Sequence, residues 1–278
     1  MMSGTALFCA THYFLIAMIT LLTDFGTRDY FVPAVKGVIL GIHPQARIID
    51  LTHEIAPQDI AAAAYTLGAC YHHFPAGTVH LAVVDPGVGS ARRGIAVEAG
   101  AQLLVGPDNG IFSYVYLRES RVRVFHLTRA EYFRQPVSPT FHGRDLFAPV
   151  AARLARGVAI DDLGEEIVDY RRLEISRPQV HESRGLIEGR IIHIDRFGNC
   201  VTNLTAREFS PGGATRMHFA GRVIDRFGTH YAQAESGDEL LAYPGSAGYW
   251  EIAVWCGSAA ALTGAEVGAA VVIELGPA

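Results

Sequence analysis

Short apolar runs alternate with helix-like stretches along the first half of the chain. The runs that we expect to form strands are 19–22, 48–51, 79–84, 95–98 and 103–105. The stretches that we expect to form helices are 30–42, 59–73 and 146–156. Pro44 ends the first helix, and Gly157 suits the C-cap of the third. Strands that alternate with helices predict an α/β domain with a largely parallel sheet.

The pattern changes near residue 165, beyond which Gly and Pro turns separate short strand-like runs. These runs are 185–194, 216–219, 249–254 and 270–274. Their spacing predicts a smaller C-terminal β-barrel or β-sandwich domain. We therefore expect an N-terminal α/β domain over 18–170, a linker over 171–184 and a C-terminal β domain over 185–278. The sequence Ile-Asp-Arg-Phe-Gly occurs at 194–198 and again at 224–228, which is too little to define a repeat architecture.

Residues 5–22 are mostly apolar but lack the marks of a targeting segment. No Lys or Arg precedes them, and no small-residue cleavage site follows. Thr11, His12 and Tyr13 interrupt the run, so we expect no membrane helix. We interpret residues 1–17 as an extension before a first strand that begins at Met18.

The composition favours a folded chain without a nucleic-acid or membrane partner. Of 278 residues, 50% are hydrophobic and 18% are charged, which argues against disorder. The formal net charge of −5 offers no attraction to nucleic acid or to an anionic membrane. The four cysteines have no paired spacing, so we expect neither a disulfide framework nor a zinc site. Isolated cysteines suit the reducing cytoplasm.

Absent motifs narrow the function further. The chain has no GxGxxG, P-loop or GxSxG sequence, the signatures of Rossmann cofactor binding, of NTPases and of α/β-hydrolases. The 12 histidines include no HExxH or other metal-binding spacing. We therefore expect neither a metal nor a cofactor.

Three polar loops, 23–29, 85–92 and 106–110, follow expected strands, at the sheet edge where α/β proteins bind ligands. Asp24 comes directly after the first strand, where its carboxylate could hold two ribose-type hydroxyls or form an Asx-turn or helix N-cap. Asp85 and Arg92 share a Gly-rich loop that could return the guanidinium to the carboxylate. Such a pair can hold a water molecule and favour its hydroxide form, or it can brace the loop. Arg93 is the competing cation.

Two further segments carry candidate chemistry. His142 precedes a predicted helix that Asp145 could cap, and an imidazole there can orient or transfer a proton, although most single histidines have no such role. The second segment combines a carboxylate, an aromatic ring and an amide: Asp195, Phe197 and Asn199. An aromatic ring can stack on a purine while an amide hydrogen-bonds its edge. The alternative is a β-turn with Phe197 in the core.

Five segments in this order resemble the S-adenosyl-L-methionine (SAM) hydroxide adenosyltransferases, relatives of the bacterial fluorinase and chlorinase. They are 19–26 (ITLLTDFG), 83–89 (VVDPGVG), 105–110 (VGPDNG), 141–145 (FHGRD) and 195–203 (DRFGNCVTN), and 249–254 (YWEIAV) is similar to a further family segment. Each motif alone is weak, but five in order are strong. The resemblance implies a two-domain fold. It also implies a homotrimer whose active sites lie between the N-terminal domain of one subunit and the C-terminal domain of the next.

The resemblance also implies roles for individual residues. It places a hydrolytic triad on Asp85, Arg92 and His142. The substrate contacts that it implies are Asp24 at the ribose, Asp29 and Asp195 at the methionine end, Phe197 and Asn199 at the adenine, and backbone around Ser246, Glu251 and Val254. Trp255-Cys256 departs from the family pattern, which looks smaller and more polar there. We expect this departure to alter the methionine end of the pocket.

The resulting hypothesis is a cytoplasmic enzyme that hydrolyses SAM to adenosine and L-methionine by in-line attack of an activated water on C5′. The halogenating relatives lack the triad, so its presence favours water over halide. Two alternatives stay open: a chlorinase-like enzyme on the same scaffold, and a non-catalytic protein that binds adenosine or SAM. A pure binder has no need of all three triad residues.

Overall fold

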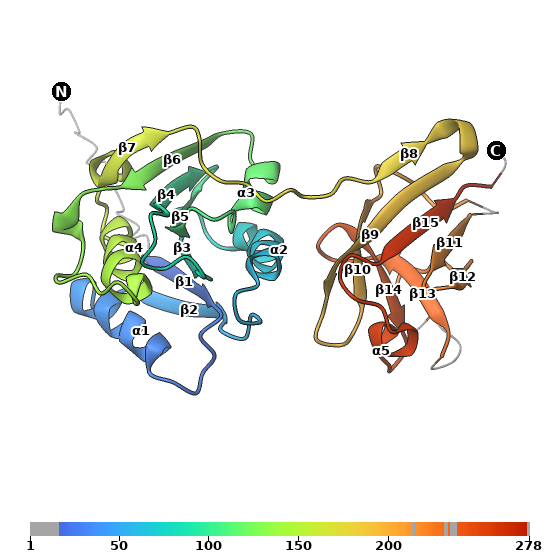
Figure 1. Ribbon diagram of the computed structural model, residues 1–278, viewed down its shortest axis with the longest axis horizontal. Helices are drawn as coiled ribbons and strands as arrows, with labels where there is room; N and C mark the ends of the chain where they lie inside the picture. The colour runs from blue at the N-terminus through green and yellow to red at the C-terminus, as the bar shows by residue number, and fades with distance from the viewer. Residues whose placement is uncertain (1–16, 213–214, 231–232, 234–237, 277–278) are drawn as a thin grey trace, which may run out of the picture. The chain divides into compact units, whose positions relative to one another are not determined.

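The computed structural model describes residues 17–212, 215–230, 233 and 238–276 (Figure 1). The chain divides into two compact units, 1–173 and 174–278. The expected extension over 1–17 lies outside the described residues except for its last residue. No described helix is both long enough and apolar enough to cross a membrane.

A seven-stranded sheet forms the centre of the first unit, in the order β2-β1-β3-β5-β4-β6-β7 (Figure 1). Its strands are β1 (Met18–Thr23), β2 (Arg47–Thr52), β3 (Val79–Val83), β4 (Gly94–Ala99), β5 (Gln102–Pro107), β6 (Val122–Leu127) and β7 (Gly164–Ile167). The pairs β1–β2, β1–β3 and β3–β5 are parallel, whereas β4, β6 and β7 pair antiparallel. The α/β prediction is confirmed, and the loops after β1 and β3 leave the parallel part at the same edge.

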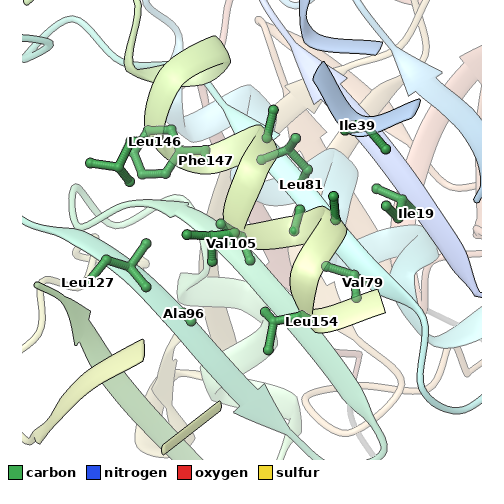
Figure 2. Packing of buried hydrophobic residues seen from close by; sticks show 14 of the residues in the cluster. Ile19, Ile39, Val79, Leu81, Ala96, Val105, Leu127, Leu146, Phe147 and Leu154 are labelled. Atoms are coloured by element: carbon green, nitrogen blue, oxygen red, sulfur yellow. The ribbon is translucent and has the colours of Figure 1, made fainter. Parts of the chain in front are cut away.

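Helices cover both faces of this sheet. They are α1 (Phe31–Ile42), α2 (Ile60–Cys70), α3 (Ser113–Arg118) and α4 (Ala148–Ala155), with short 3₁₀ turns at Tyr71–His73, Ala130–Tyr132 and Ile160–Leu163. One apolar cluster joins α1 and α4 to the sheet through residues such as Ile39, Leu81 and Leu154 (Figure 2). A second cluster, on α2 and α3, includes Leu67 and Val115. A π-helical turn, Gly143–Phe147, leads into α4, so this helical segment begins earlier than the sequence predicts.

The second unit is an antiparallel β structure with the strand order β12-β11-β15-β9-β10-β14-β13. Its strands are β8 (Gln179–His181), β9 (Leu186–Ile194), β10 (Cys200–Thr205), β11 (Arg216–Phe219), β12 (Arg222–Ile224), β13 (Leu240–Pro244), β14 (Tyr249–Val254) and β15 (Ala270–Glu274), with α5 at Ala259–Thr263 and a 3₁₀ turn at Glu182–Arg184. A bridge between Phe227, just after β12, and Ala242 of β13 brings the two edges together, so the sheet is a nearly closed barrel. This confirms the predicted β domain. The expected linker differs in part, because β8 pairs with β9.

A buried histidine makes the stability of the first unit sensitive to acid. His80 of β3 is fully buried, and its Nδ1 lies 2.8 Å from the hydroxyl of Thr20. Burial lowers the pKa of His80 to about 4. The unfolded chain, with an ordinary histidine pKa near 6.5, therefore binds a proton that the folded chain rejects, and stability falls as the pH drops through this window.

We expect the His80 contribution to the free energy of unfolding to fall by about 3 kcal/mol between pH 7 and pH 4. Urea unfolding of the wild type and of His80→Leu at both pH values measures it. Carboxylate titration is common to the two proteins, so the difference between their pH dependences isolates His80. Equal losses of stability in both proteins would contradict this assignment.

Candidate active site

Asp85 and Arg92 form a buried ion pair within the loop that joins β3 to β4. The Arg92 Nε donates to both carboxylate oxygens of Asp85, at 2.9 and 3.0 Å, and Nη2 donates to Oδ2. The two side chains are only 5% and 8% exposed. Turn hydrogen bonds fold the loop back on itself, and Gly89, with φ +78°, approaches the Pro139 carbonyl so closely that a Cβ would lie 2.4 Å from its oxygen. The loop therefore packs against the segment that carries His142.

Arg93 points to a different set of acids. Its Nε donates to Asp108 Oδ2 at 2.9 Å, and its Nη1 donates to Asp169 Oδ1 at 2.7 Å. The structure therefore resolves the competition that spacing left open: Arg92 faces Asp85, and Arg93 ties the β5 end of the sheet to residues near the unit boundary. Asp108 belongs to one of the family-like motifs; besides this ion pair, its Oδ1 accepts from the backbone N–H of Arg171 at 2.7 Å.

His142 joins the Asp85–Arg92 pair through one ring nitrogen. Its Nδ1 lies 2.8 Å from Nη2 of Arg92. A guanidinium only donates hydrogen bonds, so Nδ1 must accept, and the proton of the neutral ring is on Nε2. Burial and then the charge of Arg92 lower the pKa of His142, against the opposing charges of Asp85 and Asp145. At neutral pH the imidazole is therefore uncharged and offers an Nε2–H donor.

Asp145 holds the His142 segment in place and does not cap a helix. It is fully buried, accepts from Ser138 N at 3.0 Å, and pairs with Arg134 and Arg144 at 2.9 and 2.7 Å. Burial raises its pKa, but the hydrogen bonds from Arg144, Ser138 and Arg134 outweigh burial and lower the pKa to about 2. The prediction that Asp145 caps a helix is wrong. The helical segment begins at Gly143, before Asp145, and the Asp145 side chain bonds to the preceding loop.

A cavity of about 360 Å³ opens beside these residues. Its lining includes Asp24, Asp85 and His142, with aromatic walls from Phe25 and Phe141. Loops after β1 and β3 and the turn before α4 thus converge on one space, as the positions at strand ends predict. This concavity in the first unit combines acceptors, an imidazole and apolar surface, the composition of a small-molecule site.

Asp24 and Asp29 have different environments. Asp24 is half-buried, and its Oδ2 accepts from the backbone N–H of Gln58 at 2.8 Å, which leaves Oδ1 for a ligand. The carboxylate thus makes no cap for α1, whose N-cap is Tyr30. Asp29 is exposed and does not line this cavity. Sequence reasoning missed Gln58, which stands far from Asp24 in the chain and has an unusual φ of +70°.

The second unit has its own cavity, of about 540 Å³. It is lined by Phe197, Asn199, Val254, Cys256 and Gly257. Phe197 is 76% exposed, so the alternative that it belongs to the core is wrong. Asn199 is buried at the base of the same loop. An exposed aromatic ring can stack on a planar heterocycle, and a neighbouring buried amide can hydrogen-bond to the polar edge of that heterocycle.

Two of the expected backbone contacts, Ser246 and Glu251, do not line this cavity, whereas Val254 does. Ser246 lies exposed in the turn between β13 and β14. Glu251 is buried in β14, accepts from the Tyr243 hydroxyl at 2.5 Å, and has a pKa raised by burial. Its carboxylate braces the β13–β14 hairpin. Cys256, which sequence reasoning placed at the methionine end, lines the cavity with Phe197.

Two family models match this chain. Residues 19–164 match the family model of the SAM hydroxide adenosyltransferase N-terminal domain, and residues 189–272 match that of the C-terminal domain. An (R)-S-adenosyl-L-methionine hydrolase of Salinispora tropica is 37% identical over 260 residues, covering 90% of this chain and 95% of the relative. The hydrolase of the same name from Thermus thermophilus is 38% identical, covering 89% and 95%.

More distant and structural relatives extend the picture. A fluorinase of Nocardia brasiliensis is 24% identical, covering 93% of this chain and 97% of the relative. The crystal structure of an uncharacterized conserved protein from Thermotoga maritima superimposes with a TM-score of 0.86 at 33% identity, covering 93% of this chain and 100% of that one. The likeness therefore extends over both units.

Proposed function

This chain belongs to the SAM hydroxide adenosyltransferase family, and from that premise we propose that it hydrolyses SAM to adenosine and L-methionine. The observation that carries the proposal is the convergence of Asp85, Arg92 and His142 beside a cavity that Asp24 also lines. A carboxylate, a guanidinium and an imidazole together can hold and polarise one water molecule.

The reaction is a displacement at carbon. The sulfonium of SAM makes C5′ electrophilic, so the chemistry requires only a nucleophile placed in line with the C5′–S bond. Water oxygen bonds to C5′, the C5′–S electron pair passes to sulfur as neutral methionine leaves, and one water proton passes to Asp85 and then to solvent. The substrate supplies the positive charge, so the step needs no metal.

Each triad residue has a distinct task. Asp85 accepts the water proton, and Arg92 stabilises the negative charge that develops on the oxygen. His142 donates its Nε2–H to the same oxygen and fixes its direction, because Nδ1 is engaged with Arg92. General-base assistance alone is worth about 10²–10⁴-fold in rate, and the positioning of the water adds to it.

The substrate is held by groups from both units. Asp24 binds the ribose hydroxyls, Phe197 stacks on adenine, Asn199 reads the adenine edge, and Asp29 contacts the methionine end. The free Oδ1 of Asp24 supports the ribose contact, and the exposed ring of Phe197 supports the stacking on adenine.

Because the triad and the aromatic–amide pair belong to separate units, each with its own cavity, a homotrimer with shared active sites is the assembly we propose. Cys70, Cys200 and Cys256 are free thiols, which suits the cytoplasm.

Product analysis separates this function from its alternatives. Incubation with SAM in buffer containing chloride is expected to give adenosine and L-methionine in equal amounts. Formation of 5′-chloro-5′-deoxyadenosine would support the chlorinase-like alternative. Tight binding of adenosine in calorimetry without turnover of SAM would support the non-catalytic one.

The lowered pKa of His142 predicts how the rate depends on pH. Protonation would place two cations 2.8 Å apart and remove the acceptor that orients the ring. We expect kcat/KM to be constant near pH 7 and to fall as the pH drops below 6.5 through the lowered pKa. His142→Gln keeps an acceptor for Arg92 and an N–H donor, so it should retain part of the activity but lose this acidic limb. An unchanged limb in the variant would contradict the assignment.

A further inference from the structure

Asp195 stands at the first position of the tight loop between β9 and β10. Its Oδ1 accepts from the backbone N–H groups of Phe197 and Asn199, both at 2.9 Å. Its Oδ2 accepts from the side-chain Nδ2 of Asn199 at 2.8 Å. Both carboxylate oxygens are therefore engaged within the loop that lines the cavity of the second unit. Three of the roughly four lone-pair sites of the carboxylate are thus used within the loop, and Oδ2 keeps one for a ligand.

The contact with Nδ2 fixes which way the Asn199 amide faces. An ionised carboxylate only accepts hydrogen bonds, so it binds the NH₂ group and repels the amide oxygen. With one amide hydrogen directed at Asp195, the amide oxygen and the second hydrogen form the opposite edge. That edge is an acceptor next to a donor. A 6-aminopurine presents the complementary pair, the N6 amino group next to N7 or N1.

We infer that Asp195 is a positioning residue, which locks the Asn199 amide in the orientation that selects a 6-amino purine over a 6-oxo purine. The inference rests on the proposed function, because it assigns Asn199 to the base of the nucleoside. It is compatible with the contact with the methionine end that the family resemblance implies for Asp195, because Oδ2 accepts only one hydrogen bond within the loop. A 6-oxo purine places a carbonyl where adenine has an amino group, and it would meet the amide oxygen of Asn199. An amide free to flip would instead present its NH₂ group to that carbonyl.

The test measures the preference for adenosine over inosine by titration calorimetry. A bidentate Asn–adenine contact discriminates by about 10- to 100-fold, so we expect the wild type to prefer adenosine by that factor. Asp195→Asn lets either orientation of Asn199 find a partner, and the preference should fall to within about threefold. The KM for SAM should rise, with kcat less affected.

The chain offers a matched control in its second Ile-Asp-Arg-Phe-Gly sequence. Asp225 has the same four neighbours but is exposed, and Thr229 follows where Asn199 stands in the first copy. Asp225→Asn should leave the preference for adenosine unchanged.

Asp195→Ser provides a second test, because a hydroxyl can both donate and accept a hydrogen bond and therefore tolerates either orientation of the Asn199 amide. In an Asn199→Leu background, Asp195→Asn should cause no further loss of preference.

The outcomes separate this inference from the proposed function. If the wild type binds no adenosine and turns over no SAM, the function itself fails. If the wild type binds and prefers adenosine while Asp195→Asn and Asp195→Ser keep that preference, the positioning role is overturned. Loss confined to the KM for SAM, with the preference for adenosine intact, would also overturn the positioning role and leave Asp195 with the methionine-end contact alone.

Discussion

Replacing Asp85 with Asn is expected to lower kcat by about 10³-fold and to leave the dissociation constant of SAM nearly unchanged. The neutral amide cannot take the proton from the attacking water, and it also leaves Arg92 without its counter-charge. Both effects act on the transition state, because the proton is transferred and the negative charge on the water oxygen develops only there. Single-turnover kinetics and equilibrium binding of SAM measure the two quantities separately.

The control for this variant is Asp108→Asn, at a second Asp–Arg pair in the same unit. Asp108 is 2% exposed and pairs with Arg93, as Asp85 pairs with Arg92. Breaking a buried ion pair costs about 3–5 kcal/mol of stability, so both variants should unfold at lower denaturant concentration, Asp108→Asn by less because the Arg93 side chain is 25% exposed. Only Asp85→Asn should lose turnover at a temperature where both remain folded. Equal losses of turnover in the two variants would mean that the ion pair merely supports the loop.

Replacing Phe197 with Ala is expected to weaken adenosine binding by about 5- to 150-fold without lowering the stability of the protein. Stacking of a base on an aromatic side chain is worth about 1–3 kcal/mol, which gives that range of affinity. The ring is 76% exposed, so its removal leaves no hole in the core. Calorimetry with adenosine and thermal unfolding of the free protein provide the two readouts.

Phe209 is the matched control, because it is a buried phenylalanine in the same unit. It stacks on Trp250 at 4.9 Å between ring centroids and is 4% exposed. Phe209→Ala should cost about 3–5 kcal/mol of stability and leave the adenosine affinity of the folded protein close to that of the wild type. The reverse pattern, with Phe197→Ala destabilised and its affinity intact, would assign Phe197 to packing.

The apolar runs made the first five strands predictable from the sequence, and the polar residues after β1 and β3 marked the site edge. Strand β10 escaped prediction because its polar residues are buried by distant partners. Thr202 donates to the Trp250 carbonyl and Asn203 donates to the Ser176 carbonyl, so these side chains need no water. Residues 164–167 were missed because Gly and Glu are uncommon in strands, whereas residues 122–127 carry a strand signal in Val, Phe and Leu that the prediction did not use.

The candidate site, like the strands, was predictable from the sequence only in part. From loop spacing, either Arg92 or Arg93 could pair with Asp85. The long-range contact of Arg93 with Asp169 shows that Arg93 is engaged elsewhere. Asp145 reads as a helix cap in the sequence, whereas Arg134 and Ser138, from the preceding loop, draw it into a buried cluster. A long-range contact decided the first case, and the conformation of the loop before Asp145 decided the second.

In the proposed reaction, a water molecule held by Asp85, Arg92 and His142 attacks C5′ of SAM. A single turnover in ¹⁸O-labelled water, followed by mass spectrometry of the products, tests it most directly. We predict one ¹⁸O atom in adenosine and none in methionine. Adenosine without the label, or label found in methionine instead, would contradict the account.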